Sequence, residues 1–493
     1  MSADSSDQGS VTKKEFDNSE TPSEVFTPPS DNAALGSARR KFDFIILPVV
    51  CLFFLLAFLD RSNVGNAKTL GMQKDLKLTS NQFSLALTAT FIPYILIEIP
   101  STIVINKVGP HRLLPLLVTC WGLVTTFHGF VNSYGSLVAV RFLIGLFEGG
   151  LIPCLVLYLS TFYRRLDLHT RVAVLFTAPA LAGAFSGLLA FGINHLNEKG
   201  GQKGWRWIFF LEGGATVILA AASYFVMYAD VESAGFLTPE EKLATRQALI
   251  EDKTINEEIE PLQLKEIWSV FKEPQLIIMT PAFFANGLTL LGLGFFATAV
   301  VNSLGYTPGR SQLMSVPPYA CAFVVSVASS IVSDRFKARG FVTMSAGLLM
   351  TIGYAMFIGS HQKHIRYASL FFQISGGYVG APALCAWIAN NIMPHFRRGT
   401  ALSLIMMWCN VAGTVSTWTF NDPPTYIKPA TINLTFSIIM IFASGLNMLY
   451  LNRQNKLHEA EREEFAKSGN PADEDEQEKR RLGDRHRDFV YTL

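Results

Sequence analysis

Charged side chains follow directly after the first long apolar run of this sequence, and they are the first candidates for chemistry. The run from Phe44 to Leu59 continues into Asp60 and Arg61, with Asn63 next to them. Asp60 lies roughly 24 Å along a helix from Phe44, and a bilayer core is about 30 Å thick. Both charges are therefore expected inside the membrane, where charges persist mainly if they pair or line a watery cavity. A helix that ended at Leu59 would instead place the pair in the interface.

A second charged set lies further along the chain, in the stretch RFLIGLFEGG. Arg141, Gly145 and Glu148 share one face of a helix, and Gly145, Gly149 and Gly150 leave room for a neighbouring helix to approach. A desolvated carboxylate beside an arginine can gain or lose a proton near neutral pH. Two such carboxylate–arginine sets predict a proton-coupling device that also binds an anion. The alternative is a static buried ion pair that fixes helix packing.

Further polar residues inside apolar runs are candidates for substrate contact. Glu98 lies between two prolines, so it could bind substrate or equally relieve a distorted helix. The second half has amides and aromatic rings in place of charges. These could hold the uncharged body of a substrate by stacking and hydrogen bonding, although any single one is more often a packing residue. These second-half candidates are Asn286, Tyr319, Trp387 and Asn390.

The composition limits what the chain can be. Of its 493 residues, 49% are hydrophobic and only 16% are charged, against roughly 25% charged in soluble proteins. The net charge of +2 gives no indication of nucleic-acid binding. The six cysteines fall within apolar runs and without metal-ligand spacing, which indicates packing roles. We therefore expect a multi-pass membrane protein that is not an enzyme and needs no cofactor or metal.

Twelve apolar stretches of spanning length predict an all-α membrane protein with twelve transmembrane helices in two six-helix halves. The basic cluster Arg39-Arg40-Lys41 favours cytoplasmic termini. The chain divides as follows: 1–40, a disordered cytoplasmic tail; 41–229, the first bundle; 230–273, a cytoplasmic central loop; 274–452, the second bundle; and 453–493, a cytoplasmic tail that ends in disorder. The tryptophans at Trp205-Arg206-Trp207 predict an outer interface belt.

The halves are related by a repeat. The loop that contains Lys107, Gly109 and Arg112 recurs after the corresponding helix of the second half, where Asp334 and Arg335 stand. Charged side chains in such loops can pair with helix ends in one conformation and release them in another. We expect these five residues to form gates. Two six-helix halves related by an axis along the membrane normal are the plan of the major facilitator fold.

The repeated loops, the stretch DRSNVGNA at 60–67, Arg141 with Glu148, the Trp205–Glu212 segment and Leu482–His486 together resemble a known family. They are similar to the major facilitator superfamily, to its anion:cation symporter branch, and within it to the fungal allantoate permease and nicotinate transporter group. The resemblance runs from about residue 40 to the C-terminus. One departure is Asn106, where the superfamily loop usually has Asp, so the first gate is expected to be weaker or differently built.

The resemblance implies proton-coupled uptake of a small organic anion, such as nicotinate, allantoate or pantothenate, by alternating access. Asp60 and Glu148 would be the protonation sites, and Arg61 and Arg141 would couple protonation to substrate binding. The expected partners are the anion, protons and the lipid bilayer. We expect a monomer in the plasma membrane.

A proton-coupled drug or metabolite efflux antiporter would share this fold. Such antiporters carry a Gly-Pro-Gly-Gly-like motif in the fifth helix, and the segment Ala178–Gly187 matches it poorly. A nutrient sensor without transport would need a signalling domain, and the polar tails and central segment are too small for one. Uptake is therefore favoured over both alternatives.

Overall fold

The computed structural model describes residues 31–254, 270–336, 338–393, 395–420, 423, 425–468 and 483–493. Every regular element in these ranges is a helix. The first half contains α1 (Asp31–Thr69), α2 (Met72–Asp75), α3 (Ser80–Val108), α4 (Pro110–His128), α5 (Tyr134–Glu148), α6 (Leu151–Ser160), α7 (Arg165–Leu175), α8 (Ala178–Asn194), η1 (Lys199–Gly201), α9 (Gly204–Ser223) and α10 (Pro239–Thr254). The second half contains α12 (Pro274–Ser303), α13 (Pro308–Phe336), α14 (Arg339–Gly359), α15 (Lys363–Asn391), α16 (His395–Thr419), α17 (Ile427–Ser468) and η3 (Gly483–Arg485).

Eight helical segments in the described ranges are long and apolar enough to cross a membrane: α1, α5 with α6, α9, α12, α13, α14, α16 and α17. α3, α4, α15 and the pair α7–α8 pack among them. These elements lie where the twelve apolar stretches of the sequence predict helices. α5 and α6 are separated at Gly149 and Gly150, and α7 and α8 at Phe176 and Thr177.

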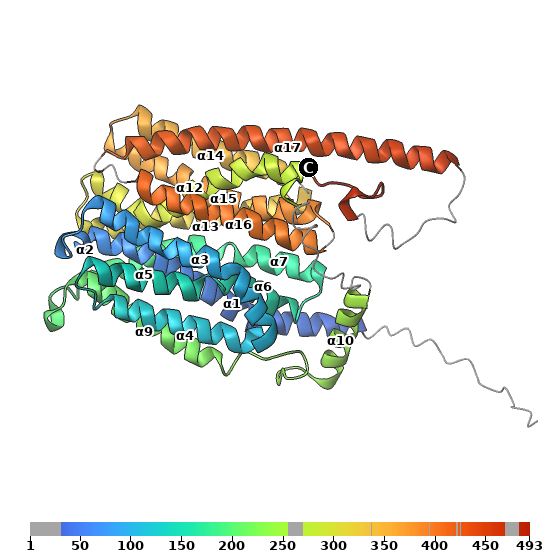
Figure 1. Ribbon diagram of the computed structural model, residues 1–493, viewed down its shortest axis with the longest axis horizontal. Helices are drawn as coiled ribbons and strands as arrows, with labels where there is room; N and C mark the ends of the chain where they lie inside the picture. Colours follow the sequence, from blue (N-terminus) through green and yellow to red (C-terminus); the bar gives the residue numbers. More distant parts are fainter. Residues whose placement is uncertain are drawn as a thin grey trace, which may run out of the picture.

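The two halves form two groups of helices that lie side by side (Figure 1). In the first group α4 packs on α9 and α3 on α5; in the second, α14 packs on α15 and α17, and α12 on α16 and α17. The groups meet where α1 contacts α12, α8 contacts α13, and α3 contacts α16. α10 and α2 lie at opposite ends of the bundle (Figure 1).

Glycine allows the closest approaches between helices. A Cβ atom at Gly145 would lie 2.0 Å from the carbonyl oxygen of Thr90, so only glycine permits α5 to rest on α3 at this depth. A Cβ atom at Gly65 would lie 1.9 Å from the carbonyl oxygen of Phe295, which brings α1 equally close to α12. The predicted role of Gly145 in close helix approach is confirmed.

Hydrogen bonds join the halves at the end of the bundle where α1 finishes. Asn66 accepts from the Thr298 hydroxyl at 2.9 Å, and its carbonyl oxygen accepts from the Gln312 amide at 3.3 Å. Ser84 donates to the carbonyl oxygen of Thr417 at 2.7 Å. These contacts come from the late turns of α1, α12 and α16 and the first turns of α3 and α13. The halves are therefore joined at this end, which is remote from the two termini (Figure 1).

The central segment is tied to the start of α1. α1 begins at Asp31, earlier than the boundary at 41 that the sequence suggested. On α10, Glu241 accepts from Lys41 and Ser37 at 2.7 Å each. Burial alone would raise the pKa of Glu241, but these two donors and the Thr238 amide lower it to about 2. α10 is therefore held to the first half through a charged carboxylate.

Trp205 corrects one interpretation of the sequence. Its side chain is fully buried, and its indole donates to Asp75 at 2.8 Å. The prediction of an outer interface belt is therefore wrong for this tryptophan, because α2 covers the start of α9 and buries the ring instead of leaving it at the membrane interface. Arg206, by contrast, is half-buried and donates to the carbonyl oxygen of Gly129 at 2.9 Å, so it connects α9 to the end of α4.

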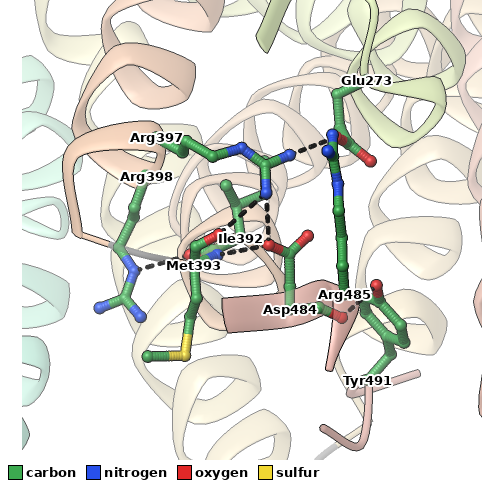
Figure 2. Close-up of polar contacts among 8 residues, drawn as sticks. All are labelled: Glu273, Ile392, Met393, Arg397, Arg398, Asp484, Arg485 and Tyr491. Carbon is green, nitrogen blue, oxygen red and sulfur yellow. Dashed lines mark hydrogen bonds and ion pairs between the residues drawn. The ribbon is translucent and has the colours of Figure 1, made fainter. Parts of the chain in front are cut away.

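The last residues of the chain return to the second half. Figure 2 shows Arg397 of α16 between Asp484, at 2.7 Å, and Glu273, which precedes α12. Burial raises the pKa of Asp484, an effect that Arg397 opposes. The predicted disorder of this tail is wrong for residues 483–493, because they have specific partners on α15, α16 and α17 and on Glu273. We name this segment the C-terminal clasp.

The C-terminal clasp also uses residues of α15 and α17. Trp387 and Asn391 both donate to the carbonyl oxygen of Thr492 at 2.9 Å, and the Thr492 amide donates back to Asn391 at 2.8 Å. Asn455 and Tyr491 exchange a similar pair of hydrogen bonds, at 2.9 and 2.7 Å. The clasp therefore links α12, α15, α16 and α17 at one end of the second half.

We predict that Asp484→Ala lowers the melting temperature of the purified protein in detergent. The substitution leaves the buried Arg397 guanidinium with one carboxylate in place of two, at an expected cost of about 1–3 kcal/mol. Arg485→Ala is the matched control, because Arg485 is exposed and makes a longer contact, of 3.3 Å, to Glu273. Equal melting temperatures for the Asp484 variant and the wild type would contradict a stabilising clasp.

Candidate functional site

A small cavity lies between the halves, and most of its lining comes from the first half. Its volume is about 10 Å³, enough for one water molecule at most, so the site is closed in this conformation. Charged and aromatic side chains make up most of its wall. The lining residues are Asp60, Arg61, Thr90, Phe91, Tyr94, Thr125, His128, Arg141, Ile144, Glu148, Phe209 and Phe295.

The cavity brings together the four charged residues that the sequence singled out. α1 supplies Asp60 and Arg61, and α5 supplies Arg141 and Glu148. The ion pair crosses between the helices, because Arg61 contacts Glu148 at 2.5 Å. The Arg61 guanidinium also lies 4.9 Å from the ring of Phe58 and 5.2 Å from that of Tyr94. The sequence suggested carboxylate–arginine sets within each helix, Asp60 with Arg61 and Arg141 with Glu148. The structure instead shows an ion pair between helices α1 and α5.

Asp60 is held by uncharged donors. The indole of Trp121 donates to it at 2.5 Å, the Thr125 hydroxyl at 3.4 Å and the Asn63 amide at 3.3 Å. The same Asn63 amide group donates to Glu212 of α9 at 2.5 Å. One amide therefore bridges two carboxylates, both of them buried. We refer to Asp60, Arg61, Arg141, Glu148 and Glu212 as the charge cluster.

A second small cavity adjoins the first and carries residues of the second half. Arg61 and Phe295 line both cavities. Tyr319 and Tyr378 form the far wall of the second, where the Tyr319 hydroxyl donates to the carbonyl oxygen of Leu293 at 3.0 Å. Aromatic rings of the second half therefore face the charge cluster.

The structure separates the other second-half candidates from these cavities. Asn286 is buried against Gly380 between α12 and α15, away from both cavity walls. Trp387 lies at the clasp end of α15 and binds Thr492, and Asn390 is close to the same end. Trp387 thus contacts the C-terminal clasp in this conformation. A role in substrate binding stays a prediction for all three.

Glu98 and the gate residues also lie outside the cavities. Glu98 is half-buried on α3. Lys107 and Arg112 are exposed around Gly109, whose φ of 86° favours glycine between α3 and α4.

In the second half, Asp334 forms an ion pair with Arg339 at 2.6 Å across its loop. Arg335, beside it, is exposed. The gating roles of these loops stay predictions.

Some residues of the site were missed from the sequence. His128 and Trp121 on α4 are lone side chains in apolar runs. Phe209 on α9 lies within the Trp205–Glu212 segment, but nothing in that segment marks this ring as part of a site. Glu212 is a charge within an apolar run, but the sequence alone does not place it beside Asp60. A pattern in α4 could have indicated its two site residues. Trp121, Thr125 and His128 recur at helical spacing, so they share the face of α4 that packs on α9.

Comparison with known proteins decides the family. The family model described as Major Facilitator Superfamily matches residues 50–417. The chain belongs to the Major Facilitator Superfamily. It is therefore a multi-pass membrane protein and a transporter, and the fold predicted from the sequence is confirmed.

Fungal transporters are among its relatives. An uncharacterized transporter of Schizosaccharomyces pombe is 33% identical over 86% of this chain and 86% of its own length. The high-affinity nicotinic acid transporter of Saccharomyces cerevisiae is 31% identical over 92% of this chain and 84% of its own length. These similarities confirm the resemblance to the fungal nicotinate-type group.

Solved structures share the fold of this transporter. A D-xylose–proton symporter has a TM-score of 0.64 with 16% identity, over 82% of this chain and 97% of its own. A bacterial homologue of the lysosomal transporter Spinster, in an inward-facing and occupied conformation, has a TM-score of 0.61 with 14% identity, over 82% and 96%. At these identities the likeness shows the fold alone.

We predict strong coupling between Arg61 and Glu148 in the stability of this transporter. Arg61→Gln or Glu148→Gln alone leaves a buried charge without its partner, at about 3–5 kcal/mol, whereas the double substitution removes both charges. Thermal unfolding of the four proteins in detergent measures the coupling. The exposed pair Arg246 and Glu232, at 3.7 Å, is the control and should give additive effects. Additivity at Arg61 and Glu148 would show that the buried pair is not coupled.

Proposed function

We propose that this transporter takes up a small organic carboxylate together with protons, by alternating access. The observation that carries the proposal is the composition of the charge cluster. It contains three carboxylates, Asp60, Glu148 and Glu212, and two guanidiniums, Arg61 and Arg141. A net charge is strongly unfavourable in a closed, apolar site. The cluster is neutral if one of its carboxylates holds a proton.

Asp60 and Glu212 are the natural place for that proton in the present conformation. They share the Asn63 amide, and neither forms an ion pair within the described residues. Two carboxylates this close repel each other when both are charged. Glu148 is instead paired with Arg61. A proton that reached Glu148 would release Arg61, so protonation and the availability of a cation are linked.

Arg141 supports the binding of an anion. Among the described residues it has no carboxylate within ion-pair distance, and its guanidinium contacts His128. Guanidinium groups bind carboxylates through paired donors, and they do so well in sites from which water is excluded. A carboxylate that entered next to Arg141 would bring one negative charge. A second proton would then keep the loaded site neutral.

The aromatic lining favours a flat substrate. Phe91, Tyr94, Phe209 and Phe295 surround the charges, and planar rings stack on such side chains. Nicotinate has a planar ring and one carboxylate, and a relative of this chain is named as a nicotinic acid transporter. Nicotinate is therefore the first substrate to test, before allantoate and pantothenate.

The conformation agrees with transport by alternating access. The halves are joined by hydrogen bonds at the end remote from the termini, and the central cavity is closed. Rocking of one half against the other would open the cavity to either side in turn. We further propose that both termini lie in the cytoplasm and that the transporter is a monomer in the plasma membrane.

Uptake of labelled nicotinate, allantoate, pantothenate and biotin into a permease-deficient yeast tests the proposal. We expect saturable uptake of one acid that is faster at pH 5 than at pH 7.5. Arg61→Ala and Glu148→Gln should reduce accumulation by about a hundredfold, because each breaks the buried pair. Glu232→Gln, in the exposed segment before α10, is the matched control and should transport like the wild type.

Two results would contradict uptake by proton symport. The first is acid uptake that depends neither on pH nor on the two substitutions. The second is an absence of acid uptake together with lower retention of cationic dyes, which would indicate the efflux alternative.

A further inference from the structure

His128 is a buried polar residue in the cavity wall, and the charge cluster does not explain its presence. It is the last residue of α4, it is fully buried, and its ring stacks on Phe209 with centroids 3.8 Å apart and planes inclined by 22°. Its side chain also makes a polar contact with Arg141. The stacking fixes the plane of the ring, so the two ring nitrogens point in fixed directions.

The contact with Arg141 determines which ring nitrogen carries the proton. Nη2 of Arg141 lies 3.4 Å from Nδ1 of His128. A guanidinium can only donate hydrogen bonds, so Nδ1 must be the acceptor. A neutral imidazole with an accepting Nδ1 carries its hydrogen on Nε2. His128 is therefore a neutral residue that presents an Nε2–H donor.

That donor has no acceptor within the described residues. Nε2 of His128 is buried and makes no hydrogen bond. Nε of Arg141 is also buried and makes no hydrogen bond. Asp60, the nearby carboxylate, already accepts from Trp121, Thr125 and Asn63. Buried donors are almost always satisfied, and an exception needs a reason. The Thr90 hydroxyl, in the same cavity wall, also lacks a partner. Unsatisfied donors on the contacting residues His128 and Arg141 suggest that a ligand supplies their acceptor.

We propose that His128 is a substrate-binding residue, which donates from Nε2 to the substrate carboxylate while Arg141 donates to the same group. This inference rests on the proposed function and assigns a second donor to its anion site. A neutral donor adds a hydrogen bond without adding a charge. It therefore strengthens anion binding and leaves the charge balance of the cluster, and with it the proton count, unchanged. Its loss should raise KM and leave the maximal rate nearly unaltered.

Two substitutions separate hydrogen bonding from stacking. His128→Phe keeps an aromatic ring against Phe209 and removes the donor. His128→Gln removes the ring and keeps an N–H donor at about the reach of Nε2. The exposed His195, which lies on the loop after α8, provides the matched control His195→Phe.

The measurement is the concentration dependence of labelled nicotinate uptake at pH 5, with the amount of each variant in the membrane determined from a fluorescent tag. His128→Phe should raise KM about tenfold and change the maximal rate by less than about twofold. His128→Gln should stay within about threefold of the wild-type KM, and His195→Phe should equal the wild type. If the Phe variant does not reach the membrane, His128→Met, which also lacks the donor, replaces it.

A larger rise of KM in His128→Gln than in His128→Phe would overturn the inference. A wild-type KM in His128→Phe, or equal losses in the Phe and Gln variants, would show that His128 acts through packing alone. The inference would also be overturned if the wild type takes up nicotinate and the KM of both His128 variants equals the wild-type KM. A wild type that takes up no acid of the panel removes the proposed function itself, and the inference with it, so the two failures are distinct.

Discussion

Burial of charge is the constraint on which the rest of this structure depends. Five ionisable side chains of the charge cluster lie where water is nearly absent, and each is tolerable only through compensation by the others. The ion pair between Arg61 and Glu148 provides one part of that compensation, and the donors around Asp60 provide another. The cluster remains one positive charge short. Under the proposed function, a proton, or a substrate anion that binds together with protons, makes the cluster neutral.

The helices are shaped to bring this cluster together. Gly145 lets α5 rest on α3, and Gly65 lets α1 reach α12. Side chains from these four helices and from α4 and α9 therefore enclose the site closely enough to exclude water. The first half supplies all five charges, and the second half supplies aromatic rings such as Tyr319. The C-terminal clasp links helices of the second half to one another. Such a division suits alternating access, because one half can carry the charges while the other moves against it.

The sequence was informative where a residue type is costly in its surroundings. Charges inside apolar runs identified Asp60, Arg61, Arg141 and Glu148, and the apolar runs themselves predicted the helices. Uncharged residues gave no such signal. Trp387 is a candidate for stacking and hydrogen bonding to a substrate by residue type alone, and its partner in the structure is Thr492, which local sequence patterns cannot connect to it.

Proton movement in step with substrate is the most direct test of the central claim, that the charge cluster is completed by a proton. The purified transporter would be reconstituted into tight liposomes that contain a pH-sensitive dye, with a nicotinate gradient and no initial pH gradient. We expect the lumen to acidify as nicotinate enters, faster than in protein-free liposomes, and the acidification to be lost in Glu148→Gln. Saturable nicotinate entry through the protein without acidification would contradict the account.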